Sequence, residues 1–97
     1  MGWKVDYSVR SHRDLQKIVE SIARDDPGAA ERFGLELIAK AESLASAPEI
    51  GVPMMERPGT RFFPFGSYLI IYRLEAKSQT VRILRFWHVA LGKRPLR

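Results

Sequence analysis

The chain has 97 residues, of which 45% are hydrophobic, and carries a formal net charge of +5 at neutral pH. This length and composition predict one folded domain over residues 1–97 and exclude a disordered chain. The sequence contains no cysteine, which excludes disulfides, a thiolate nucleophile and a thiolate metal site. It has neither an apolar run typical of a signal peptide nor a segment of transmembrane length, so we expect a soluble cytoplasmic protein.

The positive charge is concentrated in the last third of the chain. Residues 57–97 contain nine Arg or Lys residues and one acid, Glu75, so this stretch has a net charge of +8. Residues 11–47 contain five basic and seven acidic residues and have a net charge of −2. A basic surface of this kind predicts an anionic partner, either nucleic acid or an acidic protein segment.

The first predicted elements are a strand and a helix. Residues 3–8 alternate apolar and polar side chains, as a half-buried strand does. Ser11 and Asp14 have the spacing of a capping box, which predicts a helix start. The predicted helix is about 13 residues long. Its apolar stripe consists of Leu15, Ile18, Val19, Ile22 and Ala23.

A second helix is predicted over residues 27–47. Asp26 suits its N-cap, and Pro27 suits its first position, where the missing N–H costs nothing. Gly34 in its interior costs about 1 kcal/mol relative to alanine, and a close helix crossing would be a reason to accept that cost. The short connection between the helices predicts an antiparallel hairpin.

The remaining sequence predicts a loop and three strands. Residues 48–60 contain three prolines and two glycines, which indicates an ordered crossing loop. The strands are predicted over residues 60–64, 67–75 and 79–88, with turns at 66–67 and 77–78. The predicted fold is α+β with the order β-α-α-β-β-β. The helix hairpin packs on one face of a small, mainly antiparallel sheet, and the other face stays partly open.

These elements and several short motifs resemble the RelE/ParE family of toxins from bacterial type II toxin–antitoxin modules. The motifs are Asp14-Leu15 with Ile18, Asp26-Pro27, the segment 29–33, Leu44, the segment 48–51, Arg61 and the segments 66–73 and 81–88. The resemblance covers nearly the whole chain. It implies a growth inhibitor of the plasmid-stabilisation type that a cognate antitoxin holds inactive.

The family contains two activities, and the sequence favours one of them. RelE-like members are ribosome-dependent mRNA endoribonucleases, whereas ParE-like members inhibit DNA gyrase without chemistry of their own. RNA-cleaving members typically carry arginine where this chain has Leu69, and a basic or Tyr-containing segment where it has residues 89–92. His88 matches a histidine found widely in the ParE-like branch. We therefore expect a gyrase inhibitor and keep the ribosome-bound mRNA endoribonuclease as the alternative.

The nuclease alternative needs a base, an acid and cations at the phosphate. The candidates are His88 as base or acid and Arg61, Arg82 and Arg85 as cations. Strand alternation allows Arg82 and His88 to share a face and turns Arg85 to the other face unless a bulge intervenes. The more common role for such a histidine is a structural hydrogen bond at a strand end.

The basic residues also form a candidate anion-binding surface. Its predicted members are Arg61, Arg73, Arg82, Arg85, Lys93 and Arg94. Because Glu75 is the one acid in their stretch, most of them cannot be paired locally. The acidic tail of the antitoxin is the simplest partner, since it would neutralise the surface that the target uses.

Aromatic residues and methionines supply a candidate antitoxin-binding surface. Consecutive aromatics on a short strand cannot all face inward, so one or two of Phe62, Phe63 and Phe65 are expected to be exposed. Met54 and Met55 are weaker candidates for the same role. Trp3 and Trp87 are expected in the core. The two histidines give no metal-ligand spacing, so neither a metal nor another cofactor is expected.

Overall fold

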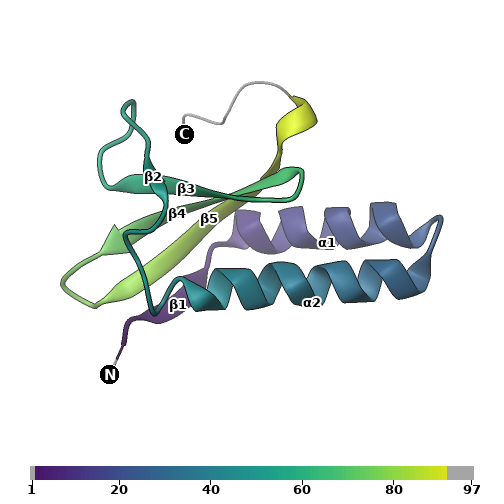
Figure 1. The fold of residues 1–97 in the computed structure, drawn as a ribbon, viewed down its shortest axis with the longest axis horizontal. Helices are drawn as coiled ribbons and strands as arrows, with labels where there is room; N and C mark the ends of the chain where they lie inside the picture. Colours follow the sequence, from purple (N-terminus) through teal and green to yellow (C-terminus); the bar gives the residue numbers. More distant parts are fainter. Residues whose placement is uncertain (1, 92–97) are drawn as a thin grey trace.

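The structure is a computed structural model that describes residues 2–91. Lys93 and Arg94, two of the predicted anion-binding residues, lie outside the described residues. The elements are β1 (Lys4–Tyr7), α1 (Val9–Ala23), α2 (Pro27–Ser43), β2 (Val52–Pro53), β3 (Thr60–Phe65), β4 (Tyr68–Glu75), β5 (Thr80–His88) and the 3-10 helix η1 (Val89–Leu91). This order, drawn in Figure 1, confirms the predicted strand, two helices and three-strand meander.

The strands form one sheet in the order β1-β5-β4-β3-β2. Neighbouring strands are antiparallel except β1 and β5, which run parallel. β4 therefore has a neighbour on each side, and its run of buried residues from Leu69 to Tyr72 is typical of a central strand. In Figure 1, α1 and α2 lie side by side along one face of the sheet, which confirms the predicted hairpin.

The sequence does not predict β2, which pairs antiparallel with β3 inside the expected crossing loop. It consists of Val52 and Pro53 alone. Two residues are too few to show an alternating pattern, and proline is a weak strand signal because it cannot donate to the ladder. At the edge of the sheet the missing N–H of Pro53 costs nothing, because that edge has no further strand.

Helix α1 begins earlier than the sequence predicts. Its N-cap is Ser8, whose hydroxyl oxygen accepts a hydrogen bond from the Ser11 N–H at 3.0 Å. Ser11, the predicted cap, is fully buried and donates its hydroxyl to the Ser8 carbonyl at 2.8 Å. Because β1 ends at Tyr7, Ser8 is the residue at which the extended chain turns into the helix.

Helix α2 ends at Ser43, four residues before the predicted end at residue 47. After it the backbone bonds tighten to three-residue turns, as in the bond from Leu44 N–H to the Ala41 carbonyl at 3.1 Å. Gly34 is buried, and a Cβ added there would lie 3.1 Å from Cγ2 of Val19 in α1. The two helices therefore cross closely at Gly34, which gives a reason for a glycine at this position.

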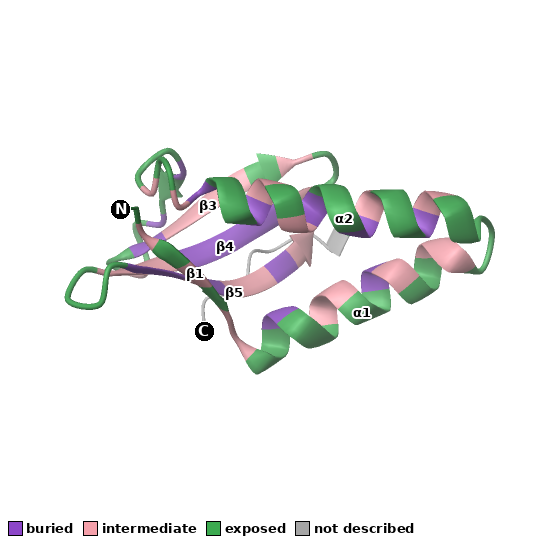
Figure 2. Ribbon diagram, turned by 90° about the horizontal axis from the view of Figure 1, so that it is seen from below, coloured by how far each residue is buried: buried purple, intermediate pink, exposed green. Residues whose placement is uncertain are grey.

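Apolar side chains form a cluster on each face of the sheet. The cluster on the helix side contains Ile18, Leu37, Ala41, Leu44, Ile70, Tyr72, Val81, Ile83 and Phe86. Figure 2 shows this burial along the strands beneath the hairpin. We call the opposite side the open face. Its smaller cluster contains Met54, Leu69 and Ile71, with Phe62, Leu84 and Trp87 packed against it.

A β-bulge interrupts β5. Tyr72 of β4 pairs with Ile83, but the preceding residue, Ile71, pairs with Arg85. Leu84 is therefore the extra residue of the bulge. An inserted residue shifts the alternation of the strand by one position, so residues after the bulge face the side opposite to the one that a regular strand predicts.

Candidate anion-binding cleft

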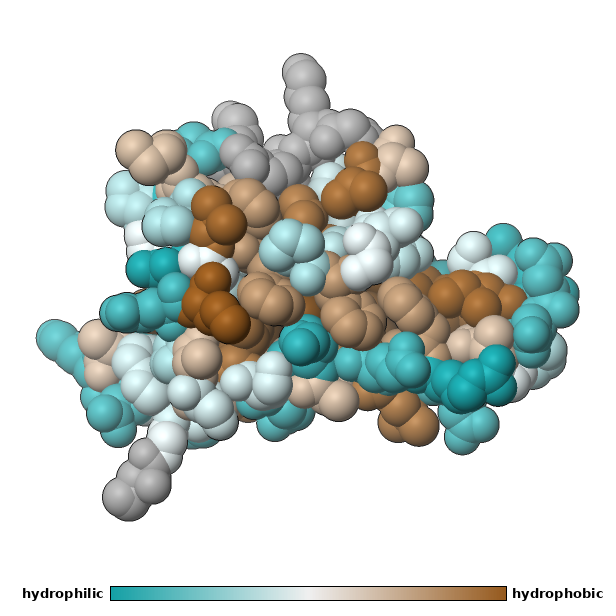
Figure 3. Space-filling model, viewed as in Figure 1, coloured by the Kyte–Doolittle hydropathy of each residue, from teal (hydrophilic) through white to brown (hydrophobic). Residues whose placement is uncertain are grey.

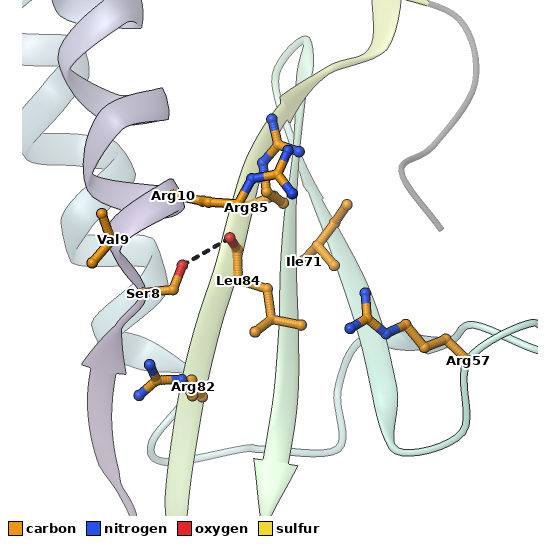
Figure 4. A pocket seen from close by; sticks show the side chains of 8 residues that line it. All are labelled: Ser8, Val9, Arg10, Arg57, Ile71, Arg82, Leu84 and Arg85. Carbon is orange, nitrogen blue, oxygen red and sulfur yellow. Dashed lines mark hydrogen bonds between the residues drawn. The ribbon is translucent and has the colours of Figure 1, made fainter. Parts of the chain in front are cut away.

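A cavity of about 340 Å³ lies on the open face, between the start of α1, the 48–60 loop and strands β4 and β5. Its lining residues are Ser8, Val9, Arg10, Arg57, Ile71, Arg82, Leu84 and Arg85. Figure 4 shows the four arginine side chains around Ile71 and Leu84. We call this cavity the arginine cleft. It combines an apolar floor with a basic rim.

The N-cap of α1 and the bulge of β5 together position the walls of the cleft. The Ser8 hydroxyl donates to the carbonyl of Leu84 at 2.9 Å. The Ser8 N–H donates to the carbonyl of Ile83 at 2.9 Å. These two bonds hold the first turn of α1, and with it Val9 and Arg10, against the bulged strand.

Arg85 is the most firmly held cation of the cleft. Its Nε and Nη2 donate to the two carboxylate oxygens of Asp14 at 2.7 and 3.1 Å. The same carboxylate accepts the Phe86 N–H at 3.0 Å, and both charged side chains are only 15% exposed. The guanidinium also lies over the ring of Trp87, 5.1 Å from its centroid. Asp14 therefore compensates the charge of Arg85 and fixes its position.

Arg82 is held more loosely. Its Nη1 makes one contact with Oδ2 of Asp6 at 2.7 Å, and the two side chains are 35% and 55% exposed. Ion pairs this exposed contribute about 0–1 kcal/mol. The other oxygen of Asp6 accepts the N–H of Tyr7 at 2.9 Å. An external anion can therefore compete with Asp6 for Arg82 at little energetic cost.

Within residues 2–91, the side chains of Arg10 and Arg57 make neither an ion pair nor a hydrogen bond. Arg10 belongs to the first turn of α1, which contains no acidic residue. A helix N-terminus favours negative charge, so a cation at this place weakens the helix slightly and raises the local positive potential. Arg10 and Arg57 are thus the two cleft cations available to an anion without exchange of partners.

Neither Arg10 nor Arg57 stands out in the sequence as a candidate site residue. If the helix is predicted to start at Ser11, Arg10 lies outside it, and a basic residue outside a helix does not indicate a binding site. With Ser8 recognised as the cap, Arg10 becomes a cation at the positive end of a helix, which is the signal that could have found it. For Arg57, which lies in an irregular loop, the sequence offers no such signal.

Two of the predicted arginines, Arg82 and Arg85, pair with acids that are distant in the sequence. Arg73 instead pairs with a near neighbour, Glu75, at 3.1 Å. Asp6 and Asp14 reach the cleft from β1 and α1, because the parallel pairing of β1 with β5 brings the start of the chain beside its last strand. Part of the charge imbalance between the two ends of the sequence is therefore neutralised in the fold.

Arg61 lies away from the cleft. It pairs in register with Tyr72, whose side chain belongs to the helix-side core. Its Nη1 donates to the carbonyls of Glu49 and Gly51 at 3.0 and 2.8 Å. The Tyr72 hydroxyl donates to the Pro48 carbonyl at 2.8 Å and accepts the Gly51 N–H at 2.9 Å. Burial raises the pKa of Tyr72, so the hydroxyl stays protonated and these bonds fix the start of the loop.

His88 also lies away from the cleft, on the helix side of the sheet. Its ring packs edge-on against Tyr68 at a centroid distance of 4.7 Å, and its Nδ1 accepts the Ala90 N–H at 3.2 Å. The prediction that Arg82 and His88 share a face is wrong, because the bulge at Leu84 shifts the alternation between them. The structure thus separates His88 from Arg82 and Arg61, whereas His88 and Arg85 both line a second, smaller cavity of about 200 Å³ beside Asp14 and Trp87.

The three phenylalanines of β3 are all partly buried, so the prediction that one or two are exposed is wrong. They divide between the two faces of the sheet: Phe62 packs on the open-face cluster, and Phe63 and Phe65 pack on the helix-side core. Lys40 of α2 lies over the Phe63 ring at 5.5 Å. Figure 3 shows apolar surface between the sheet and the helices. Contact of these residues with an antitoxin stays a prediction.

The two methionines differ in burial. Met55 is 90% exposed, whereas Met54 is 2% exposed and belongs to the open-face core. This burial counts against Met54 as a contact residue. Trp3 and Trp87 are partly buried and pack against the two clusters, in agreement with their predicted place in the core.

The described residues, 2–91, contain no group of three or more His, Asp or Glu side chains that could hold a metal ion. No helix in this part of the chain is long and apolar enough to cross a membrane.

Sequence comparison places the chain among toxins. The profile of a family described as "ParE toxin of type II toxin-antitoxin system, parDE" matches residues 5–90. The chain is 37% identical over 90 residues to "Toxin RelE1" of Caulobacter vibrioides, and this alignment covers 91% of the chain and 95% of that relative.

Solved structures with the same fold support this placement. A chromosomal ParDE system from P. aeruginosa matches with a TM-score of 0.75 at 17% identity, covering 89% of this chain and 95% of that one. The RelBE2 toxin–antitoxin complex from Mycobacterium tuberculosis matches with a TM-score of 0.70 at 27% identity, covering 91% and 99%. From its sequence and its fold, the chain belongs to the RelE/ParE family of toxins of type II toxin–antitoxin systems.

Proposed function

We propose that this toxin inhibits growth by acting on DNA gyrase, without chemistry of its own, and that a cognate antitoxin neutralises it. The match to a ParE toxin profile over residues 5–90 supports the gyrase target by analogy. The similar RelBE2 protein was solved as a toxin–antitoxin complex, which supports an antitoxin partner in the same way. Such an inhibitor needs a surface that binds its target, and the arginine cleft supplies one.

The chemistry of the cleft carries this proposal. Its charged lining residues are Arg10, Arg57, Arg82 and Arg85, and no histidine or carboxylate of residues 2–91 lines it. Arginine stays protonated in proteins and cannot take the proton of a 2′-OH group. The cleft is therefore better suited to holding an anionic group of a target than to cleaving RNA.

A RelE-like mRNA endoribonuclease acting on the ribosome is the second candidate function. The 37% identical relative bears the name Toxin RelE1. Four arginines around one cavity also form an arrangement that can stabilise the charge of a phosphate in a transition state. In this candidate His88 would supply the base and Arg85, with which it lines a second cavity outside the arginine cleft, would supply a cation.

Two assays on the purified chain test the proposal. We expect inhibition of DNA supercoiling by gyrase and intact mRNA in a translation mixture. Arg10→Gln/Arg57→Gln removes the two cleft cations whose side chains have no partner among residues 2–91 and should weaken inhibition about tenfold or more. Arg24→Gln/Arg32→Gln removes the same charge at exposed positions outside the cleft and should leave inhibition unchanged.

His88→Gln separates the two candidate functions. A gyrase inhibitor that does no chemistry should keep its activity in this variant, since His88 lies outside the cleft. Ribosome-dependent mRNA cleavage that disappears in His88→Gln would overturn the proposal in favour of the endoribonuclease.

A further inference from the structure

The apolar floor of the arginine cleft restricts what it can bind. Ile71 and Leu84 form the floor, and Val9, which is 66% exposed, stands at the rim. The cavity volume of about 340 Å³ is at the lower end of the range of ligand pockets. A phosphate backbone would leave such a floor uncovered, whereas one large apolar side chain would fill it.

The lining of the cleft also argues against a nucleobase as the group that fills it. Proteins hold unpaired bases by stacking them on aromatic rings. None of the eight lining residues is aromatic. Trp87, an aromatic residue of the open-face cluster, already lies under the guanidinium of Arg85 at 5.1 Å. Apolar floor and basic rim together fit a peptide segment better than a nucleic acid.

The four arginines of the rim differ in their readiness to accept a new partner. Arg85 is held by two bonds to Asp14 at 15% exposure. Arg82 has one bond to a carboxylate that is 55% exposed, and Arg10 and Arg57 have no side-chain partner within residues 2–91. Asp6 thus places a carboxylate beside the cleft at the position where an incoming acid would bind.

We infer that the arginine cleft binds a protein segment in which carboxylates flank an apolar side chain, and that Asp6 occupies the place of one of those carboxylates in the free toxin. The apolar side chain rests on Ile71 and Leu84. The flanking carboxylates bind Arg10, Arg57 and Arg82, and Asp6 gives up Arg82 when they do. This inference rests on the proposed function, since it takes the segment to belong to the antitoxin.

Binding of a synthetic peptide to the full-length toxin tests the inference directly. The probe is a fluorescent-labelled peptide with one leucine between two pairs of glutamates, measured by polarisation at low salt. The matched probes replace the leucine with glycine or the glutamates with glutamine. We expect the glutamate–leucine peptide to bind and each replacement to weaken binding by about tenfold or more.

Asp6→Asn tests the competitor role of Asp6. Removing this carboxylate should tighten binding of the glutamate–leucine peptide about threefold to fivefold, because the peptide then no longer has to break an exposed ion pair. In an Arg82→Gln background the same change should have no effect, because Asp6 then has no arginine to release. Circular dichroism of each variant is the control for correct folding. Unchanged affinity in Asp6→Asn would overturn the competitor role.

A single-stranded RNA of equal charge provides the competing outcome. If it binds more tightly than the peptide, or if glycine in place of leucine changes nothing, the cleft is a nucleic-acid or general anion site and the inference is wrong. Absence of peptide binding at millimolar concentration would contradict it as well. These measurements use neither gyrase nor ribosomes, so their result is independent of whether the proposed target is correct.

Discussion

At the scale of single residues, Asp14 has the largest structural role among the acids near the cleft. Its carboxylate accepts two bonds from Arg85 and one from the Phe86 N–H. These bonds tie α1 to the part of β5 that follows the bulge, where β1 no longer provides a neighbour. Asp14 therefore accepts a backbone hydrogen bond that a neighbouring strand would otherwise accept, and it orients the side chain of Arg85.

Asp14→Asn should destabilise the protein by about 2 kcal/mol, because the guanidinium of Arg85 would stay mostly buried without a counter-charge. Urea unfolding measures the change. The matched control is Glu75→Gln, which breaks the Arg73 ion pair at 38% exposure and should cost less than about 1 kcal/mol. Equal effects of the two changes would show that Asp14 acts as an ordinary surface acid.

The sequence predicts the cations of the site better than their partners. Arg82 and Arg85 stand out because they lie in a basic stretch on a strand. The acids that pair with them are 76 and 71 positions away in the sequence. Only the parallel neighbours β1 and β5 bring them together, and a strand pattern does not say which strand will be its neighbour.

At the scale of elements, the two helices and four of the strands follow from apolar periodicity, whereas the bulge does not. Residues 81–87 include apolar side chains on both faces of β5, so one extra residue leaves the pattern almost unchanged. Yet the extra residue, Leu84, turns Phe86 into the core and places His88 on the opposite face from Arg82. The candidate site fails to form as predicted for this local reason.

The crossing of α1 and α2 allows a second test. Alanine is favoured over glycine by about 1 kcal/mol in a helix, but a Cβ on Gly34 would lie 3.1 Å from Val19 Cγ2. Gly34→Ala should therefore stabilise the protein more in a Val19→Ala background than in the unmodified chain, by at least about 0.5 kcal/mol. Thermal unfolding of the four proteins of this cycle measures the coupling.

Gly28→Ala provides the control for this cycle. Gly28 lies in the first turn of α2, and a Cβ there would meet Arg32 and Asp26 rather than Val19. Its effect should be the same in both backgrounds. The proposed crowding at the helix crossing would be refuted by a Gly34 effect that is also independent of Val19.

At the scale of the whole molecule, three tyrosines link stability to alkaline pH. Burial raises the pKa of Tyr7, Tyr68 and Tyr72 above the ordinary value of 10.0. For Tyr7, the hydrogen bond that its hydroxyl donates to Glu42 at 2.6 Å raises the pKa further. In the unfolded chain these hydroxyls lose their protons at about pH 10.

Above that pH the unfolded state binds fewer protons than the folded state, so the free energy of unfolding decreases as pH rises. Urea midpoints at about pH 8 and about pH 11 should therefore differ, with the lower midpoint at the higher pH. Tyr7→Phe removes one of the three groups and should make this decrease smaller. A midpoint that is constant or rises between the two pH values would contradict the prediction.

The parallel pairing of β1 with β5 has a consequence for the time at which the toxin becomes competent. The cleft joins Ser8 and Arg10 to Arg82 and Leu84, and Ser8 and Leu84 are 76 positions apart in the chain that the ribosome makes. Until residues 80–88 leave the ribosome, β1 has no strand to pair with, and the cleft lacks Arg82, Leu84 and Arg85. The cleft therefore cannot form before residues 80–88 have left the ribosome, and an antitoxin that recognises it can bind the toxin only after that point.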